Sequence, residues 1–261
     1  MEHGGDDQFL NKRVRCGIAI FFGLFCLSVC IGTYAQGGPP MVTDDPGTPG
    51  DGHWEINLAT IGSRTTQRWD IDVLDADINY GWGDHVQLKL DAPLTYRHTG
   101  GESTVWGLGA VNVGVKWRFV DSGDAFPFDV SMYPQYLSAW SNASKKRGLA
   151  SPDDEFFLPV EIGTQAAGFD IAAELGRDFV GGTQDRWEGG IVAAHECGPV
   201  ECRFEIHQTS FGDDAQTLLN LGLTWKLSDS LVLLASAGRE FGPHTADRQD
   251  FLYYFGFQIL R

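Results

Sequence analysis

The chain has 261 residues, of which 43% are hydrophobic and 21% are charged, and these averages describe an ordinary soluble protein of one or two domains. Its 35 acidic and 19 basic residues leave a net charge of -16. This charge argues against a nucleic-acid-binding protein. Most of the non-specific affinity for nucleic acid comes from neutralisation of its phosphates, and an acidic chain would repel them. A bundle of transmembrane helices is excluded, because only residues 16–34 form an uncharged run of membrane-spanning length. The 33 glycines and the 12% of aromatic residues favour β-structure.

Residues 1–35 have the three-part pattern of a secretory signal peptide. Lys12, Arg13 and Arg15 precede an apolar run, and residues 33–35 (Thr-Tyr-Ala) then place small side chains on both positions that a cleavage site requires. An uncleaved anchor helix is the alternative. We predict export, with a mature chain that begins at Gln36.

Export changes the number of cysteines that the mature protein holds. The chain has five cysteines, and cleavage leaves only Cys197 and Cys202. An oxidising compartment favours a disulfide between them. Their spacing is too tight for a zinc site with four ligands, and the mature chain has no second cysteine pair to complete one.

Residues 36–52 are rich in proline and glycine, which predicts an irregular N-terminal segment. Asp44, Asp45 and Asp51 raise the alternative of a calcium loop. Their spacing does not match the EF-hand pattern, and Asp beside Pro and Gly is typical of turns. We therefore predict neither a metal site nor a cofactor.

Period-two alternation of apolar and polar residues marks nearly every segment after His53, which is typical of strands with two different faces. In residues 219–227, for example, the apolar series Leu, Leu, Leu, Trp, Leu alternates with Asn, Gly, Thr and Lys. The pattern predicts strands over residues 53–61, 69–80, 84–96, 105–119, 126–138, 155–166, 169–179, 186–196, 201–209, 216–227, 230–241 and 251–260.

Three features indicate that residues 53–261 form a membrane barrel. The strands are long enough for a tilted crossing, aromatic residues recur near strand ends, and long polar connections follow the odd-numbered strands while mostly tight turns follow the even-numbered ones. We predict an all-β, transmembrane antiparallel up-and-down β-barrel of about 12 strands, in the bacterial outer membrane with both termini periplasmic. Closure removes the sheet edges, which find no water to bind in lipid.

Two motifs resemble a known family. Residues 40–59 (PMVTDDPGTPGDGHWEINLA) and 233–241 (LLASAGREF) are similar to the outer-membrane proteins of the MetA-pathway phenol-degradation transporter family. The resemblance covers about 30 residues. It implies an exported barrel that passes small, often hydrophobic or aromatic, molecules, and it assigns no site residues. The last strand also carries an outward aromatic stripe like that of bacterial outer-membrane barrels, although the chain ends in Ile-Leu-Arg rather than in an aromatic residue.

The polar phase of the strands is predicted to face the lumen. This phase holds Glu55, Asn57, Gln87, Lys89, Asp91, Asn112, Lys116, Arg118, Asp170, Glu174, Glu205, His207 and Asn220. These side chains form either a water-lined path or a salt-bridged plug, and both alternatives stay open. Residues 37–52 are expected to fold into the lumen, and the acidic excess predicts a preference for cations.

The main hypothesis is a passive channel for small molecules, and two alternatives remain. A barrel-embedded hydrolase would use His207 as a base beside the hydroxyl of Thr209, because residues two apart share one face of a strand. A secreted soluble β-protein would bind an apolar ligand. For the channel, the expected partners are outer-membrane lipid, the barrel-assembly machinery, and lipopolysaccharide beside the basic residues 145–147.

Overall fold

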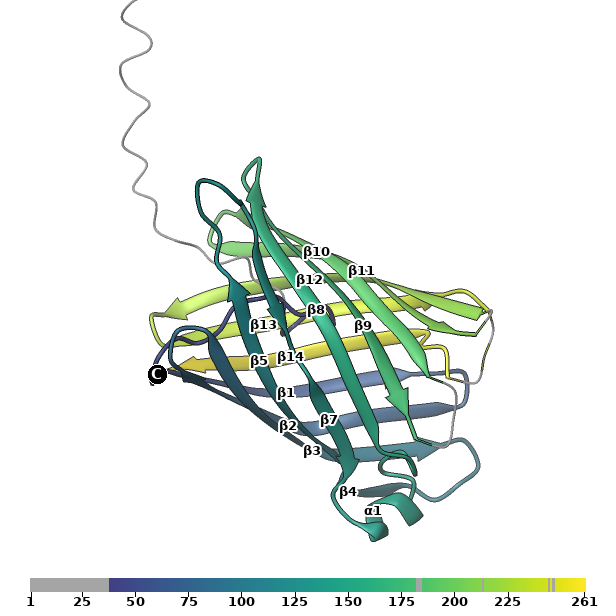
Figure 1. Ribbon diagram of the computed structural model, residues 1–261. Helices are drawn as coiled ribbons and strands as arrows, with labels where there is room; N and C mark the ends of the chain where they lie inside the picture. The colour runs from purple at the N-terminus through teal and green to yellow at the C-terminus, as the bar shows by residue number, and fades with distance from the viewer. Residues whose placement is uncertain (1–37, 182–184, 213, 244, 246) are drawn as a thin grey trace, which may run out of the picture. The chain divides into compact units, whose positions relative to one another are not determined.

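The computed structural model describes residues 38–181, 185–212, 214–243, 245 and 247–261 (Figure 1). The predicted signal peptide lies outside these residues. The strands are β1 (Trp54–Arg64), β2 (Arg68–Trp82), β3 (Val86–Thr99), β4 (Val105–Leu108), β5 (Ala110–Val120), β6 (Asp129–Met132), β7 (Gln135–Ala139), β8 (Glu155–Ala166), β9 (Phe169–Val180), β10 (Arg186–Cys197), β11 (Val200–Phe211), β12 (Asp214–Ser228), β13 (Leu231–Phe241) and β14 (Phe251–Leu260). The helix is α1 (Asn142–Lys146).

The strands form a closed antiparallel barrel, as predicted. Each wall strand pairs with its neighbours in the chain, and β1 pairs with β14 to close the sheet, with Ile56 opposite Ile259. Trp54 N–H donates to the carbonyl of Arg261, so that both chain ends of the barrel lie at one rim. The segments β4 and β5 act as one wall strand, as do β6 and β7, and the fourteen described segments therefore make twelve wall strands.

Two of the predicted strands are interrupted, and a local cause is visible in each. Between β4 and β5, a Cβ atom on Gly109 would lie 2.4 Å from Thr95 Oγ1, so that the backbone passes too close to β3 for a side chain. Between β6 and β7, Pro134 has no N–H to donate to the sheet. The wall nevertheless continues through both breaks, because β3 pairs with β4 and with β5, and β5 pairs with β6 and with β7.

The connections differ in length less than we expected. At the rim that holds the chain ends, the turns are tight at residues 83–85, 167–168, 198–199 and 229–230, with a longer connection at 121–128. At the opposite rim, residues 140–154 and 242–250 are long, but 65–67 and 212–213 are tight. Our expectation of a long connection after every odd-numbered strand was therefore wrong, because β1, β2, β11 and β12 extend further than the alternation indicated.

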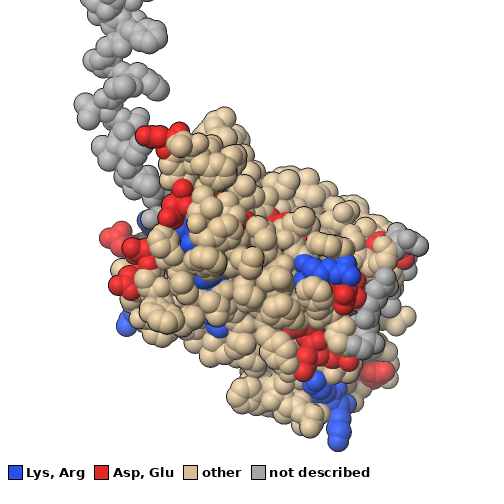
Figure 2. All heavy atoms as spheres, in the orientation of Figure 1, with Lys and Arg blue, Asp and Glu red and all other residues tan. Residues whose placement is uncertain are grey.

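The barrel carries most of its large apolar residues on the outside, although a small apolar cluster of Ala59, Val232, Leu234 and Tyr254 is buried inside. Leu221 is 65% exposed, Ile191 57% and Trp117 56%, whereas Glu161, Glu205 and Asn220 are fully buried. Most of the wall seen in Figure 2 is free of charged side chains. A soluble protein would bury these large apolar side chains, so this distribution fits a barrel surrounded by lipid and not the soluble alternative.

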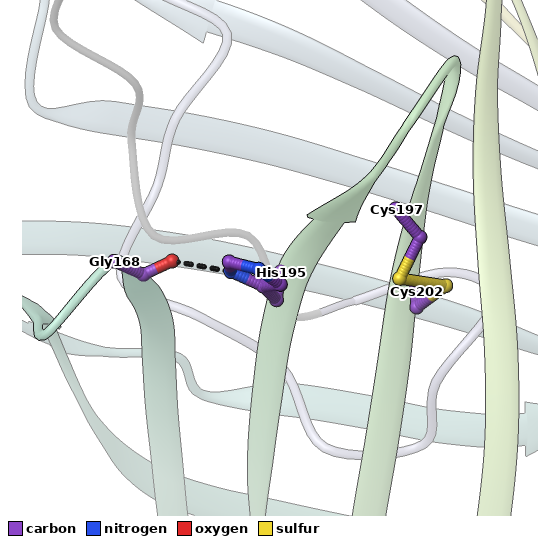
Figure 3. The surroundings of a disulfide bond; sticks show 4 residues. All are labelled: Gly168, His195, Cys197 and Cys202. Atoms are coloured by element: carbon purple, nitrogen blue, oxygen red, sulfur yellow. Dashed lines mark hydrogen bonds between the residues drawn. A yellow bond between two sulfur atoms is a disulfide. The ribbon is translucent and has the colours of Figure 1, made fainter.

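Cys197 and Cys202 form a disulfide across the hairpin between β10 and β11 (Figure 3). Beside it, His195 Nδ1 lies 2.7 Å from the carbonyl oxygen of Gly168 in the neighbouring turn (Figure 3). The disulfide closes one hairpin, and the His195 contact joins this hairpin to the turn at 167–168, both at the rim that holds the chain ends.

In the part of the chain that the structure describes, no helix has the length and apolar character needed to cross a bilayer.

A charge on the outer wall should destabilise the barrel in proportion to its depth. Leu221 lies at the middle of β12 and Leu227 near its end, and both face outward. We expect Leu221→Arg to lower the free energy of unfolding by about 2–4 kcal/mol and Leu227→Arg by about 0–1 kcal/mol, because only the first places a cation at the bilayer centre. Urea unfolding in lipid vesicles measures both values. Equal losses of unfolding free energy in the two variants would show that Leu221 does not lie nearer the bilayer centre than Leu227.

Candidate functional site

The inside of the barrel is the candidate site. All the predicted lumen residues lie on the inward-facing phase of their strands, and most of them are buried: Glu55, Asn57, Gln87, Lys89, Asp91, Asn112, Lys116, Arg118, Asp170, Glu174, Glu205, His207 and Asn220. Several are bonded to one another. Asn57 Nδ2, for example, donates to Glu55 at 3.1 Å and to Asp77 at 3.2 Å.

Residues 38–52, which we call the lumen segment, enter this space and contact several wall strands. Ser236 Oγ on β13 donates to the carbonyl of Pro40 at 2.7 Å. At the rim, Thr48 Oγ1 donates to the carbonyl of Asp84, and Gly52 N–H donates to that of Gly81. The segment is therefore held along its length by polar contacts with the wall.

Glu205 on β11 is the first of two strong anchors of the lumen segment. Its carboxylate accepts hydrogen bonds from two consecutive backbone N–H groups, Val42 at 3.2 Å and Thr43 at 2.6 Å, and from Asn220 Nδ2 at 2.9 Å. The side chain is fully buried. Hydrogen bonds to an ionised group are about twice as strong as neutral ones, so this carboxylate fixes the turn at Val42 and Thr43.

Lys116 on β5 is the second anchor. Its ammonium lies 3.1 Å from Asp44 of the lumen segment and 3.3 Å from Glu161 on β8, and it also donates to the carbonyl of Asp45. The same group lies 4.6 Å from the ring centroid of Tyr133. A cation that is only 2% exposed needs such partners, because the desolvation of an unpaired charge is very unfavourable.

Two glycines of the wall make room for the lumen segment. A Cβ atom on Gly190 would lie 2.1 Å from Thr43 Oγ1, and one on Gly222 would lie 2.4 Å from Met41 Cε. A side chain at either position would displace Thr43 or the end of Met41 from its place. The wall is therefore shaped to fit Met41 and Thr43, and the fit is steric as well as polar.

Cavities lined by charged side chains lie on both sides of the lumen segment. A cavity of about 160 Å³ opens toward the rim of the chain ends and is lined by Glu55, Asp77, Asn79 and Lys89. Toward the opposite rim, a cavity of about 280 Å³ is lined by Asp75, Asp91, Glu174 and His207, and one of about 300 Å³ by Arg186, Glu188, Thr209 and Glu240. Residues of the lumen segment line the first two, and Val42 also reaches the third.

The wall formed by β1, β2 and β3 is the most acidic part of the interior. Asp75 and Asp77 on β2 face Asp91 on β3, and Lys89 Nζ lies 3.6 Å from Asp77. The Oδ1 atoms of Asp77 and Asp91 are buried and accept no hydrogen bond within the part of the chain that is described. This wall therefore presents carboxylate oxygens to the cavities.

The candidate base of the hydrolase alternative contacts the lumen segment. His207 Nδ1 lies 3.2 Å from Thr43 Oγ1, and His207 itself is only 5% exposed. Thr209 lines the cavity of about 300 Å³ toward the rim opposite the chain ends. Among the described residues, the hydroxyl that contacts His207 is that of Thr43, which places this histidine in the attachment of the lumen segment.

The aspartates that suggested a calcium loop take part in turns and ion pairs. Asp44 accepts from Asp45 N–H and pairs with Lys116, Asp45 accepts from Gly47 N–H, and Asp51 accepts from Gly83 N–H. Across the described residues, no three His, Cys, Asp or Glu side chains are grouped as metal ligands.

Some residues of the site were not predicted. Glu161 and Asp77 lie on the inward phase of predicted strands, so the same alternation identifies them once every strand is followed. Tyr133 carries no such signal, because Pro134 interrupts the alternation beside it. Ser236 resembles any other small strand residue, and its role depends on Pro40, which lies 196 residues away in the chain.

The fold resembles solved outer-membrane channels. An outer membrane channel from Pseudomonas putida F1 aligns over 87% of this chain and all of its own, with a TM-score of 0.64 and 9% identity. The NanC porin aligns over 78% of this chain and 98% of its own, with a TM-score of 0.56 and 9% identity. The KdgM porin, solved in complex with disordered oligogalacturonate, aligns over the same shares with a TM-score of 0.54 and 10% identity.

These similarities concern the fold. No protein family and no curated protein sequence matches the chain, so membership of the MetA-pathway phenol-degradation transporter family stays a proposal. The similar proteins named above are channels and porins and not enzymes. The barrel architecture and its apolar outer face together locate the protein in a bacterial outer membrane.

Removal of the Glu205 anchor should release the lumen segment. In Glu205→Ala, the buried N–H groups of Val42 and Thr43 lose their acceptor, and each unsatisfied group costs about 1–3 kcal/mol. We expect faster hydrogen exchange in residues 38–48 and little change in the wall strands. Exchange mass spectrometry measures both, with Glu196→Ala, an exposed carboxylate on β10, as the control. Unchanged exchange in residues 38–48 would show that Glu205 does not hold the segment.

Proposed function

We propose that the protein is a passive outer-membrane channel for small molecules, and that the lumen segment controls its opening. The observation that carries this proposal is the pair of cavities inside one closed barrel, separated by an irregular segment that is held by non-covalent contacts and by its continuation into β1. Barrels of 8 strands are filled by side chains and those of 16 enclose an aqueous channel, so a barrel of twelve wall strands lies between the two. The similar folds belong to channels, which supports the same function.

The lumen segment can leave its position without disturbing the wall. No part of it is a strand of the barrel, and within the lumen its chief attachments are the wall side chains Glu205, Lys116 and Ser236. At the rim, Thr48 and Gly52 are also held by the backbone carbonyls of Asp84 and Gly81. Displacement breaks these contacts but none of the pairings between strands. The two alternatives for the interior therefore describe two positions of one segment: a plug when the anchors hold, and a water-lined path when they release.

The permeant that we propose is small and partly apolar. The cavity toward the opposite rim is lined by carboxylates and also by Pro39, Pro40, Met41 and Val42 of the lumen segment, and Val42 is 48% exposed. A molecule that passes the segment therefore meets apolar side chains within a polar bore. The resemblance to the phenol-degradation transporter family supports the same class, small aromatic or hydrophobic molecules.

Deletion of residues 38–48 should open the channel. We expect a several-fold increase in single-channel conductance in planar bilayers, because the bore widens where the segment separates the cavities. Deletion of residues 145–150 at the rim provides a control of similar kind, and heat-modifiable gel mobility checks that each barrel is folded. An unchanged conductance in the first variant would refute the role proposed for the segment.

The open channel should prefer cations. Buried carboxylates outnumber buried basic groups among the described residues, and Asp75, Asp77 and Asp91 line one wall together. We expect a reversal potential of cation-selective sign in a KCl gradient, and a smaller potential in the double variant Asp75→Asn/Asp91→Asn. Anion preference in the unaltered protein would contradict this assignment of the bore.

A further inference from the structure

Three arginines project from the outer wall, and each one lies over an aromatic ring. The pairs are Arg64 with Trp69 at 5.5 Å, Arg177 with Trp187 at 5.2 Å, and Arg239 with Phe241 at 5.0 Å. All three arginines lie within the last four residues of their strands, at the rim opposite the chain ends. Within the described strands, the other Lys and Arg residues occupy the inward phase.

This rim faces the outer leaflet, because both termini of a bacterial barrel are periplasmic. A cation at this depth is close to the lipid headgroups, whereas one at the bilayer centre would destabilise the barrel. The basic residues of the loop at 140–154 are partly engaged elsewhere: Lys145 lies 3.0 Å from Asp154, and Arg147 donates to the carbonyl of Trp106. The wall arginines therefore add positive charge at headgroup level to that of the loop.

An apolar groove begins beside one of these pairs. It has a volume of about 560 Å³ on the outer face of β9, β10 and β11, and its sides include Leu175, Trp187, Ile191, Phe204 and Ile206. Its floor is made of small residues. A Cβ atom on Gly189 would lie 3.1 Å from Leu175 Cδ1, so the absence of a side chain at this position deepens the groove.

Polar groups are confined to the upper end of this groove. In the sheet register, Trp187 lies between Arg177 on β9 and Ser210 on β11. In the next row of outward-facing residues, Gly189 lies between Leu175 and Gln208. Below these rows come Ala173, Ile191 and Ile206. The surface thus has a cationic, hydrogen-bonding head and an apolar tail, aligned along the membrane normal.

We propose that this surface binds a phosphorylated, acylated lipid of the outer leaflet, of the lipid A class. The guanidinium of Arg177 would bind a headgroup phosphate, for which its planar array of donors is well suited. One acyl chain would occupy the groove beneath Trp187. Arg177 also contacts Asp185 at 3.1 Å, which orients the guanidinium, and its side chain remains 32% exposed and accessible. This site lies on the outer wall and is independent of conduction through the lumen.

The test uses the full purified protein and diphosphoryl lipid A, with bound lipid counted by native mass spectrometry. We expect one tightly held lipid, and an affinity about tenfold lower in Arg177→Gln, since a hydrogen bond between charged groups is lost. Ala173→Phe, which fills the groove, should lower binding similarly. The matched controls are Ala237→Phe, on the outer face of β13, and Arg261→Gln, at the rim of the chain ends. Heat-modifiable mobility confirms that every variant is folded.

Three results would overturn the proposal. Binding within about twofold of the unaltered protein in both Arg177→Gln and Ala173→Phe would show that neither the headgroup contact nor the groove is used. Displacement of the lipid by millimolar inorganic phosphate would indicate a simple anion site. If the unaltered protein formed dimers and the Ala173→Phe variant were monomeric, the groove would be an interface between barrels.

Discussion

The hydrogen bonding between β1 and β14 is the constraint on which the rest of the structure depends. In lipid, an unpaired backbone N–H or carbonyl has no water to bind, so a sheet that crosses the membrane must close. Here the first and last strands pair over ten consecutive positions, from Glu55 opposite Leu260 to Arg64 opposite Phe251. Closure in turn divides every strand into two faces, one toward lipid and the other toward an enclosed space.

That enclosed space creates an electrostatic problem, because the inward face carries many charged groups. Lys116 cannot remain unpaired at 2% exposure, and its partners come from two sources: Glu161 of the wall and Asp44 of the lumen segment. Glu205 is in a similar position and binds two backbone N–H groups of the same segment. The irregular segment therefore supplies buried charges of the wall with partners beyond those that the wall strands provide. This dependence couples the stability of the interior to whether the bore is blocked.

The outer face is mostly apolar, and its few charged residues are confined to particular positions. An arginine that faces lipid is unfavourable unless it lies near the headgroups, and Arg64, Arg177 and Arg239 all lie near one rim. Each is stacked on an aromatic ring, which holds it against the wall. The two rims of the barrel thus differ chemically as well as in their loops.

Alternation along the chain was sufficient to predict the strands and their faces, because the side-chain period of a strand is local. It placed Lys116, Glu205 and His207 on the inward face without any knowledge of their partners. It was less informative about strand ends, which extended into predicted connections such as 62–68, and it missed the breaks at Gly109 and Pro134.

By itself, then, the sequence determined the fold class, the approximate number of strands and the polar phase, all of which follow from a repeat of two residues. Only the tertiary structure decided what the polar phase binds. The contact of Thr43 with Glu205 joins residues 162 positions apart, and that of Pro40 with Ser236 joins residues 196 apart. The lumen segment has no periodicity, and closure of the barrel is what brings it within reach of β5, β11 and β13 together.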